Sequence, residues 1–209
     1  MDKRFIIILS AIIVVFIGLV VFSRTSAPAT PASSGSKNFF GKMDSSVTLT
    51  EFVDFQCEAC YAFYPTVKEI KEKYKDRVKF QIRYFPITSG HQYAKMAAAY
   101  GESAARQGKF FEMHDKIFEG QKIWERSSKP NEYFDGYAKE LGLDMKKLAV
   151  DVQSSEVNAV ISADLKAVKA LGGTGTPTFA LNGKKIENPG NKVEEFEKLL
   201  DDALARAKN

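Results

Sequence analysis

The two cysteines of the chain, Cys57 and Cys60, stand two residues apart in the segment FVDFQCEACYAFYP. Such a pair can form a structural disulfide, hold a metal ion or exchange disulfides with other thiols. A structural disulfide would close a very short loop, which the chain-entropy model values at roughly 2 kcal/mol against roughly 3 for a 15-residue loop. A zinc site needs further close ligands. The chain has no third cysteine, and its two histidines, His91 and His114, lie far apart in the sequence, so we favour exchange chemistry.

Disulfide exchange needs a thiolate, because the ionised sulfur is the nucleophile. A cysteine in the first turn of a helix meets unpaired backbone N–H groups and the positive end of the helix dipole, which stabilise its charge. Apolar residues at helical spacing in VKEIKEKY predict a helix that begins at the cysteine pair, has a kink at Pro65 and ends at about Lys75. With Cys57 as the attacking residue, Cys60 lies one turn further on the same face and can resolve a mixed disulfide.

Strand signals flank this helix. The segment VTLTEFVDF, from Val47, mixes alternation with β-branched and aromatic residues and predicts a largely buried strand. VKFQIRYFP predicts a second strand after the helix. Near the carboxyl end, TPTFALNGKKIE predicts a hairpin, because Asn182-Gly183 suits a tight turn.

Helical patterns dominate residues 92–170, where glycine-containing breaks suggest four or five helices. Another amphipathic helix is expected over 193–207, with apolar residues along one face. The order of elements is strand, helix, strand, helical block, hairpin and helix. This order predicts an α/β fold with a helical insertion.

Taken together, EFVDFQCEACYAFYP, the helical block and GTGTPTFALNG resemble the DsbA-like branch of the thioredoxin-fold thiol-disulfide oxidoreductases, particularly its membrane-anchored members. The resemblance covers residues 38–209. It implies an α/β thioredoxin fold whose helical insertion spans about 92–170, and a redox-active centre that needs no metal or organic cofactor.

The resemblance also implies roles for site residues. Cys57 would be the exposed nucleophile and Cys60 the buried resolving thiol. Pro177 would follow a cis peptide bond beside the disulfide, and the backbone of Thr176 would pair with an extended substrate; alternatively, Thr176-Pro177 only begins an edge strand. Glu51 matches the position of a buried acid that exchanges a proton with Cys60 through water, unless it simply faces solvent on its strand.

Two features depart from the strongest oxidants of that branch. The carboxylate of Glu58, next to Cys57, disfavours a second negative charge, so we expect a less stabilised thiolate. Thr176 before the proline is typical of weaker oxidants, isomerases and reductases. The direction of electron flow therefore stays open, and Asp54 is expected to shape the loop before the cysteines.

An apolar run over residues 5–22 follows Lys3 and Arg4 and spans about 27 Å at roughly 1.5 Å per residue. We expect residues 1–23 to be a single-pass transmembrane anchor (a signal-anchor) and residues 24–37, rich in Ser, Thr, Ala and Pro, to be a linker. A cleaved signal peptide is the main alternative, since Ala27-Pro28-Ala29 offers a cleavage pattern, and a buried core helix is a weaker one. The short amino-terminal flank favours a cytoplasmic amino terminus, which places the catalytic domain on the extracytoplasmic side of the cell membrane.

The formal net charge is +4, from 30 Lys and Arg against 26 Asp and Glu, and much of the excess lies in the first 37 residues. The folded part has no evident basic stripe, so we expect no nucleic-acid partner. The function expected is a monomeric thiol-disulfide oxidoreductase that introduces disulfide bonds into cysteine-containing exported proteins and is reoxidised by a membrane redox partner. The alternatives are a reductase or isomerase of the same fold, or a peptide-binding chaperone module with a static disulfide.

Overall fold

The computed structural model describes residues 34–207. The expected anchor at 1–23 and most of the expected linker lie outside this range, so both stay predictions. Within 34–207, no helix combines the length and the apolar character needed to cross a membrane.

A five-stranded mixed sheet forms the centre of the described domain, with strand order β1-β3-β2-β4-β5. Strands β2 and β3 are parallel, and the other neighbouring pairs are antiparallel. The strands are β1 (Asn38–Gly41), β2 (Thr48–Val53), β3 (Lys79–Tyr84), β4 (Thr178–Leu181) and β5 (Lys184–Lys185). The central strand β2 is buried on both faces, so the polar residues Thr50 and Glu51 are buried along with its apolar ones.

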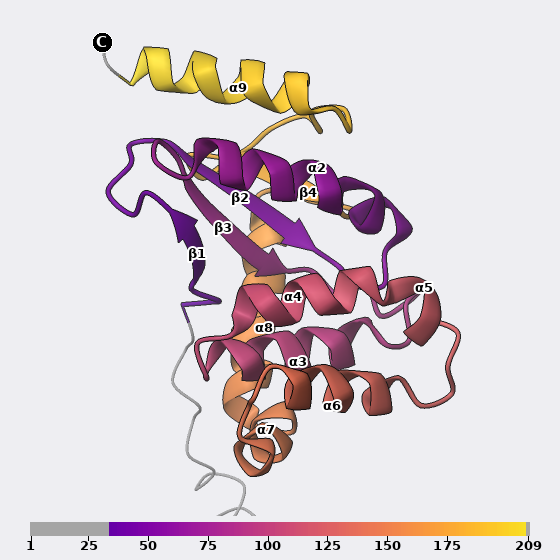
Figure 1. Cartoon of the computed structure of the whole chain (residues 1–209). Coiled ribbons are helices and arrows are strands. Elements are labelled where there is room, and N and C mark those ends of the chain that lie inside the picture. The colour runs from indigo at the N-terminus through magenta and orange to yellow at the C-terminus, as the bar shows by residue number, and fades with distance from the viewer. Residues whose placement is uncertain (1–33, 208–209) are drawn as a thin grey trace, which may run out of the picture. The chain divides into compact units, whose positions relative to one another are not determined.

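Helices cover both faces of the sheet (Figure 1). Helix α2 (Glu58–Tyr74), which continues through Pro65, and helix α9 (Val193–Arg206) pack with Leu49 of β2 around one apolar cluster. On the opposite face, Phe52 of β2 packs with Val168 of α8 (Ser155–Ala170). Because side chains alternate along a strand, Glu51 belongs to the same face as Leu49, under α2.

The interval between β3 and β4 is helical, where the sequence predicts a helical block (Figure 1). Its helices are α3 (Ala94–Ala105), α4 (Phe110–Glu119), α5 (Gln121–Trp124), α6 (Pro130–Glu140), α7 (Met145–Val152) and α8. They enclose an apolar cluster with Met113, Trp124 and Phe134 at its centre, and this cluster also contains Cys60. The helical insertion and the cysteine pair therefore share one core.

The number of helices in the insertion differs from the expected four or five. The continuous helical pattern after Gly142 is divided at Gln153 and Ser154, where the Ser154 side chain accepts a hydrogen bond from Val157 N and caps α8. Residues 120–131, where the sequence suggests a break between helices, also contain the short helix α5. A serine that caps a helix can be recognised in a sequence, but the apolar spacing on both sides of Ser154 conceals the boundary.

The beginning of the domain also differs from expectation. Strand β1 was not predicted, because four residues are too few to establish alternation, and it forms by pairing with β3. Gly35 and Ser36, assigned to the linker 24–37, are buried. Ser36 donates from N and Oγ to the carboxylate of Asp164, at 3.0 and 2.6 Å. A buried carboxylate in α8 thus holds the last residues of the expected linker against the folded domain.

The hairpin and the last helix match the sequence predictions. Asn182 and Gly183 have φ angles of 49° and 76°, the positive values that a tight two-residue turn requires. Helix α9 buries Phe196 and Leu200 along one face. These elements depend on local turn chemistry and periodicity, both of which the sequence displays directly.

Candidate active site

Cys57 is the N-cap residue of α2 and has an extended backbone (φ −72°, ψ 126°). Its N–H donates to the carbonyl oxygen of Asp54 at 3.1 Å, which forms a tight turn before the helix. Its side chain is partly exposed, and its Sγ lies 3.4 Å from the carbonyl oxygen of Thr176. The expected helix start therefore places this sulfur at the positive end of α2, beside the loop that carries Pro177.

This setting lowers the pKa of Cys57 from 9.0 to about 5. Hydrogen bonding from the Cys60 thiol has the largest effect, and hydrogen bonding from the backbone N–H groups of Cys60 and Ala59 adds to it. Partial burial opposes these effects. At neutral pH the Cys57 sulfur is therefore a thiolate.

Cys60 has the opposite character. Its side chain is 1% exposed, and burial raises its pKa well above the ordinary value. Hydrogen bonding with Cys57 and the charges of Cys57 and Glu51 raise it further. One turn of α2 thus carries an ionised, accessible sulfur and a protonated, buried one. No disulfide joins the two cysteines in this structure.

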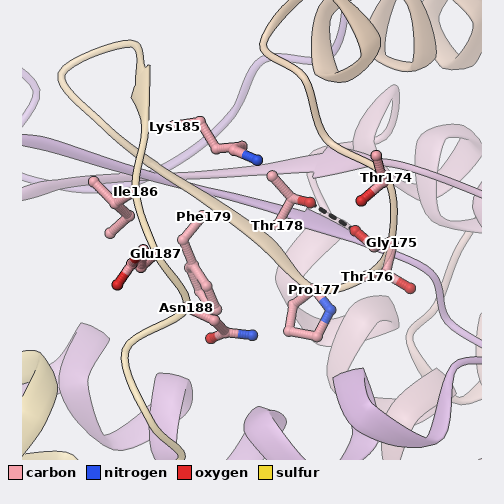
Figure 2. Close-up of a pocket in the computed structure, with 10 residues that line it drawn as sticks. All are labelled: Thr174, Gly175, Thr176, Pro177, Thr178, Phe179, Lys185, Ile186, Glu187 and Asn188. Atoms are coloured by element: carbon pink, nitrogen blue, oxygen red, sulfur yellow. Dashed lines mark hydrogen bonds between the residues drawn. The ribbon is translucent and has the colours of Figure 1, made fainter.

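The peptide bond between Thr176 and Pro177 is cis, which confirms the predicted geometry. This loop forms one side of a pocket, and the segment after β5 forms the other (Figure 2). The pocket is lined by Thr174, Gly175, Thr176, Pro177, Thr178, Phe179, Lys185, Ile186, Glu187 and Asn188. The Thr176 carbonyl oxygen, 3.4 Å from Cys57 Sγ, places this pocket beside the cysteine pair.

Glu51 is 5% exposed, so the alternative in which it faces solvent is wrong. Burial raises its pKa from 4.5 to about 8, and the charge of Lys71 lowers it by a smaller amount. The carboxyl group makes no hydrogen bond or ion pair with any residue in the described range 34–207. At neutral pH Glu51 therefore holds a proton, and its charge acts on Cys60 when it ionises.

Lys71 and His114 line the same narrow space as Glu51, together with Tyr64 and Phe118. Lys71 is 5% exposed, and its ammonium group lies 4.4 Å from the ring centroid of Phe111. Burial lowers the pKa of His114 to about 4, so its imidazole is neutral. No chemical role for either residue is expected from the sequence. The apolar neighbours of His114 in FFEMHDKIF were the available signal that it is buried.

The carboxylate of Asp54 shapes the loop, as the sequence predicts. It accepts hydrogen bonds from Gln56 N at 2.8 Å and from Ile87 N at 2.7 Å, and it lies 2.8 Å from His91 Nδ1. These contacts join the cysteine turn to the segment after β3. Within residues 34–207, no group of three or more acidic, histidine and cysteine side chains is arranged to hold a metal ion.

Glu58 contributes less than its position next to Cys57 suggests. Its side chain is 84% exposed and pairs with Lys122 of α5 at 3.4 Å. The pKa of Cys57 is low despite this neighbouring carboxylate. An exposed charge is screened by water, whereas the hydrogen bonds to Cys57 act at contact.

A thioredoxin-like fold with a Cys-x-x-Cys pair at a helix amino terminus defines the class of this domain. A family model described as "Thioredoxin" matches residues 33–202, and the chain belongs to this family. Similar solved structures include a thioredoxin-like oxidoreductase from Silicibacter pomeroyi DSS-3, with a TM-score of 0.67 and 25% identity over 79% of this chain and 90% of that one.

DsbA-family oxidoreductases are also structural neighbours. BdbD from Bacillus subtilis has a TM-score of 0.68 and 23% identity, covering 84% of this chain and 100% of that chain. Wolbachia pipientis alpha-DsbA1 has a TM-score of 0.70 and 19% identity, covering 81% and 92%. At these identities the likeness shows the fold.

Curated relatives include a Na(+)/H(+) antiporter NhaA 3 from Salinispora tropica, 33% identical over 168 residues, or 80% of this chain and 25% of that protein. Another is a Na(+)/H(+) antiporter NhaA from Herminiimonas arsenicoxydans, 33% identical over 146 residues, or 70% of this chain and 22% of that protein. This chain spans about a quarter of the length of these relatives, and their printed activity is that of the longer proteins.

Proposed function

We propose that this protein is a thiol-disulfide oxidoreductase that introduces disulfide bonds into exported proteins by dithiol-disulfide exchange at Cys57 and Cys60. One observation carries the proposal: within a single helical turn, the pKa of one thiol is lowered to about 5 and that of its partner is raised. This asymmetry gives the two sulfurs different tasks. The DsbA-family structural neighbours support a role in thiol-disulfide exchange.

The reaction begins with the oxidised pair. A substrate thiolate attacks Cys57 Sγ, the Cys57–Cys60 bond breaks, and Cys60 leaves with the electron pair and takes up a proton. A second substrate thiolate then attacks the substrate sulfur of the mixed disulfide, and Cys57 leaves as a thiolate. Two substrate thiols have become a disulfide, and the enzyme pair has become a dithiol. The low pKa of Cys57 makes it a good leaving group in the second step.

Glu51 supplies the proton that Cys60 needs. A thiol with a raised pKa leaves poorly as an anion, and the neutral Glu51 carboxyl group can protonate the departing sulfur through an intervening water molecule. Reoxidation of the pair reverses this transfer, and the proton returns to Glu51. The oxidant is a membrane redox partner that accepts two electrons from the dithiol.

The substrate binds as an extended segment in the pocket between the Thr176-Pro177 loop and the segment after β5. The Thr176 backbone pairs with the substrate backbone, which brings the substrate sulfur to Cys57. Backbone pairing does not depend on the substrate's side chains. This mode of binding suits an enzyme that acts on many exported proteins.

The pKa of Cys57 favours oxidation over reduction. At about 5, it lies between the values of about 7 for thioredoxin, a reductant, and about 3.5 for DsbA, a strong oxidant. A more stable thiolate stabilises the reduced pair and raises the reduction potential. The reductase or isomerase alternative has its main support in Thr176, the residue before the cis proline.

A redox titration in glutathione buffers tests the direction of exchange. We expect a potential more oxidising than the value of about −270 mV of thioredoxin. A potential at or below the thioredoxin value would contradict the oxidase and support a reductase.

Two variants test the chemistry itself. Cys57→Ser should abolish exchange, and Cys60→Ser, incubated with a disulfide-bonded substrate, should accumulate a mixed disulfide as the Cys57 thiolate attacks that disulfide and the other substrate sulfur leaves as a thiolate. A static disulfide in a chaperone module predicts instead that Cys57→Ser retains its effect on substrate folding and that no mixed disulfide forms. Asp201→Asn, on the exposed surface of α9, is a suitable control.

The cellular setting is part of the proposal. The apolar run over residues 5–22 supports a single-pass anchor, with the catalytic domain extracytoplasmic and monomeric. Membrane fractionation of the full chain, followed by protease treatment of intact cells, tests this arrangement. Recovery of the full-length chain in the soluble cytoplasmic fraction would contradict it.

A further inference from the structure

Gln121 begins α5, the short helix in the insertion, and its side chain is completely buried. Its Nε2 donates to the carbonyl oxygen of Phe55 at 2.8 Å and to that of Cys57 at 3.1 Å. Both carbonyl groups belong to the turn that leads into α2. A side chain from the insertion therefore holds the backbone of the nucleophile.

The chemistry of these contacts sets the orientation of the amide. The opposite orientation would place Oε1 against two carbonyl oxygens, which donate no hydrogen bond. In the observed orientation Oε1 is buried and has no hydrogen-bond partner within the part of the chain that the structure describes. An unpaired buried oxygen lowers stability. Glutamine at this position is thus poorly explained by stability alone.

The turn before α2 is held from two sides. Asp54 binds it on one side, through its carboxylate to Gln56 N and its carbonyl oxygen to Cys57 N. Gln121 binds it on the other side, through the carbonyl groups of Phe55 and Cys57. The Cys57 carbonyl also accepts the first helical hydrogen bond, from Tyr61 N at 3.0 Å. A second donor on this carbonyl restricts rotation about the Cα–C bond of Cys57.

That rotation decides where the helix donors lie relative to the sulfur. The thiolate of Cys57 depends on the N–H groups of Ala59 and Cys60 and on the Cys60 thiol, all within the first turn of α2. A small rotation at Cys57 misaligns every one of these donors. Their combined effect is therefore sensitive to a single backbone contact.

We propose that Gln121 is a positioning residue, which holds the Cys57 carbonyl so that Cys57 Sγ stays aligned with the first turn of α2. The inference rests on the proposed exchange function and adds a role for the helical insertion. Through Gln121, the insertion tunes the nucleophile without touching substrate or sulfur.

Gln121→Met tests this role, because methionine has a similar size and shape and no N–H donor. The thiolate of the reduced full chain can be followed by ultraviolet absorbance and by the pH dependence of iodoacetamide labelling. We expect the pKa of Cys57 to rise by about one unit. At pH 7 the equilibrium with glutathione should shift about tenfold toward the enzyme disulfide, a potential about 30 mV less oxidising.

Ser103→Ala is the matched control. Ser103 is a fully buried polar residue of α3 in the same insertion, and its hydroxyl donates to the Ala99 carbonyl oxygen at 2.7 Å. This variant removes a buried hydrogen bond without contact with the cysteine turn. It should lower the melting temperature and leave the Cys57 titration unchanged.

A milder variant covers the case in which Gln121→Met does not fold. Gln121→Asn keeps an amide but is one methylene shorter, so it can reach one carbonyl at most, and a smaller rise of the Cys57 pKa is expected. A Cys57 titration unchanged from wild type in either folded variant would overturn the inference. If the wild-type thiol itself titrates like an ordinary cysteine, the proposed function fails instead, and the two failures are thereby distinguished.

Discussion

Two buried carboxylates in this domain have opposite surroundings. Asp164 of α8 is completely buried, and its oxygens accept hydrogen bonds from Ser36, from Arg83 at 2.7 Å and from Tyr84 N at 2.9 Å. Glu51 of β2 is 5% exposed, and its carboxyl group makes no hydrogen bond with any of residues 34–207. The two side chains belong to opposite faces of the sheet.

The contrast separates a structural carboxylate from one that can exchange a proton. The donors around Asp164 stabilise its charge and join the start of the domain to β3 and α8. Glu51 lacks such donors, so burial raises its pKa to about 8. Only a carboxyl group with a pKa near neutrality can both give and take a proton under physiological conditions.

Asp164→Asn should give the largest loss of stability. It leaves the guanidinium of Arg83, whose side chain is 17% exposed, without its partner, and breaking a buried ion pair costs about 3–5 kcal/mol. Urea denaturation of the reduced protein measures this loss, and the Cys57 titration should not move. Asp201→Asn, which breaks an exposed pair with Arg77, should cost less than about 1 kcal/mol. A loss of similar size in both variants would contradict the structural role of Asp164.

Glu51→Gln should change how stability depends on pH. The pKa of Glu51 is 4.5 when unfolded and about 8 when folded, so the unfolded state releases this proton first and wild-type stability falls as pH rises through this range. The variant has no carboxyl group to titrate at this position. Its free energy of unfolding relative to that of wild type should therefore rise by on the order of 3 kcal/mol between pH 5 and 8. Denaturation of both proteins across this range measures the difference. A constant difference would contradict the buried, protonated state of Glu51.

The same variant should slow exchange, because glutamine cannot give a proton to Cys60. Loss of a general acid typically costs about 10²-fold or more. Stopped-flow measurement of mixed-disulfide formation from the oxidised enzyme reports this step directly, because Cys60 leaves and is protonated in it. Asp164→Asn is the informative comparison here: it should be less stable but should form the mixed disulfide at the wild-type rate.

Lys71→Met should raise the pKa of Glu51 further, because the Lys71 ammonium group favours the ionised carboxylate. A rise of about one unit is expected. The effect appears as an extension of the pH range over which stability falls, and as a shift of the Glu51 carboxyl resonance in NMR titrations. Lys68→Met is the control, since Lys68 is about half exposed and pairs with Asp115. A Glu51 pKa that is lower in Lys71→Met than in wild type would contradict the electrostatic influence of Lys71 on Glu51.

Glu58→Gln should have the smallest effect. The Glu58 carboxylate is exposed and paired with Lys122, so removing its charge should change the pKa of Cys57 by no more than about 0.3 unit. The titration used for the Gln121 variants measures this shift. A fall of a full unit would show that an exposed acid beside the thiol matters as much as the buried contacts.

Local sequence predicted much of the fold. The two-residue spacing of Cys57 and Cys60, the buried strand before them and the Asn182-Gly183 turn each correspond to an element that forms through neighbouring residues. The cis bond before Pro177 followed from the resemblance to the DsbA-like branch. Strand β1 and the boundary at Ser154 were missed, since their signals are short or masked by a continuing pattern.

The sequence by itself determined that the chain carries a Cys-x-x-Cys pair at the start of a helix in an α/β fold, because periodicity, capping and turn chemistry act between residues close in the chain. Only the tertiary structure decided which thiol ionises, that Glu51 is buried without a partner, and that Gln121 and His114 of the insertion lie beside the cysteine turn and Glu51. Burial and hydrogen-bond partners depend on segments that are distant in the sequence. They are therefore set by how the insertion packs on the sheet and not by any local pattern.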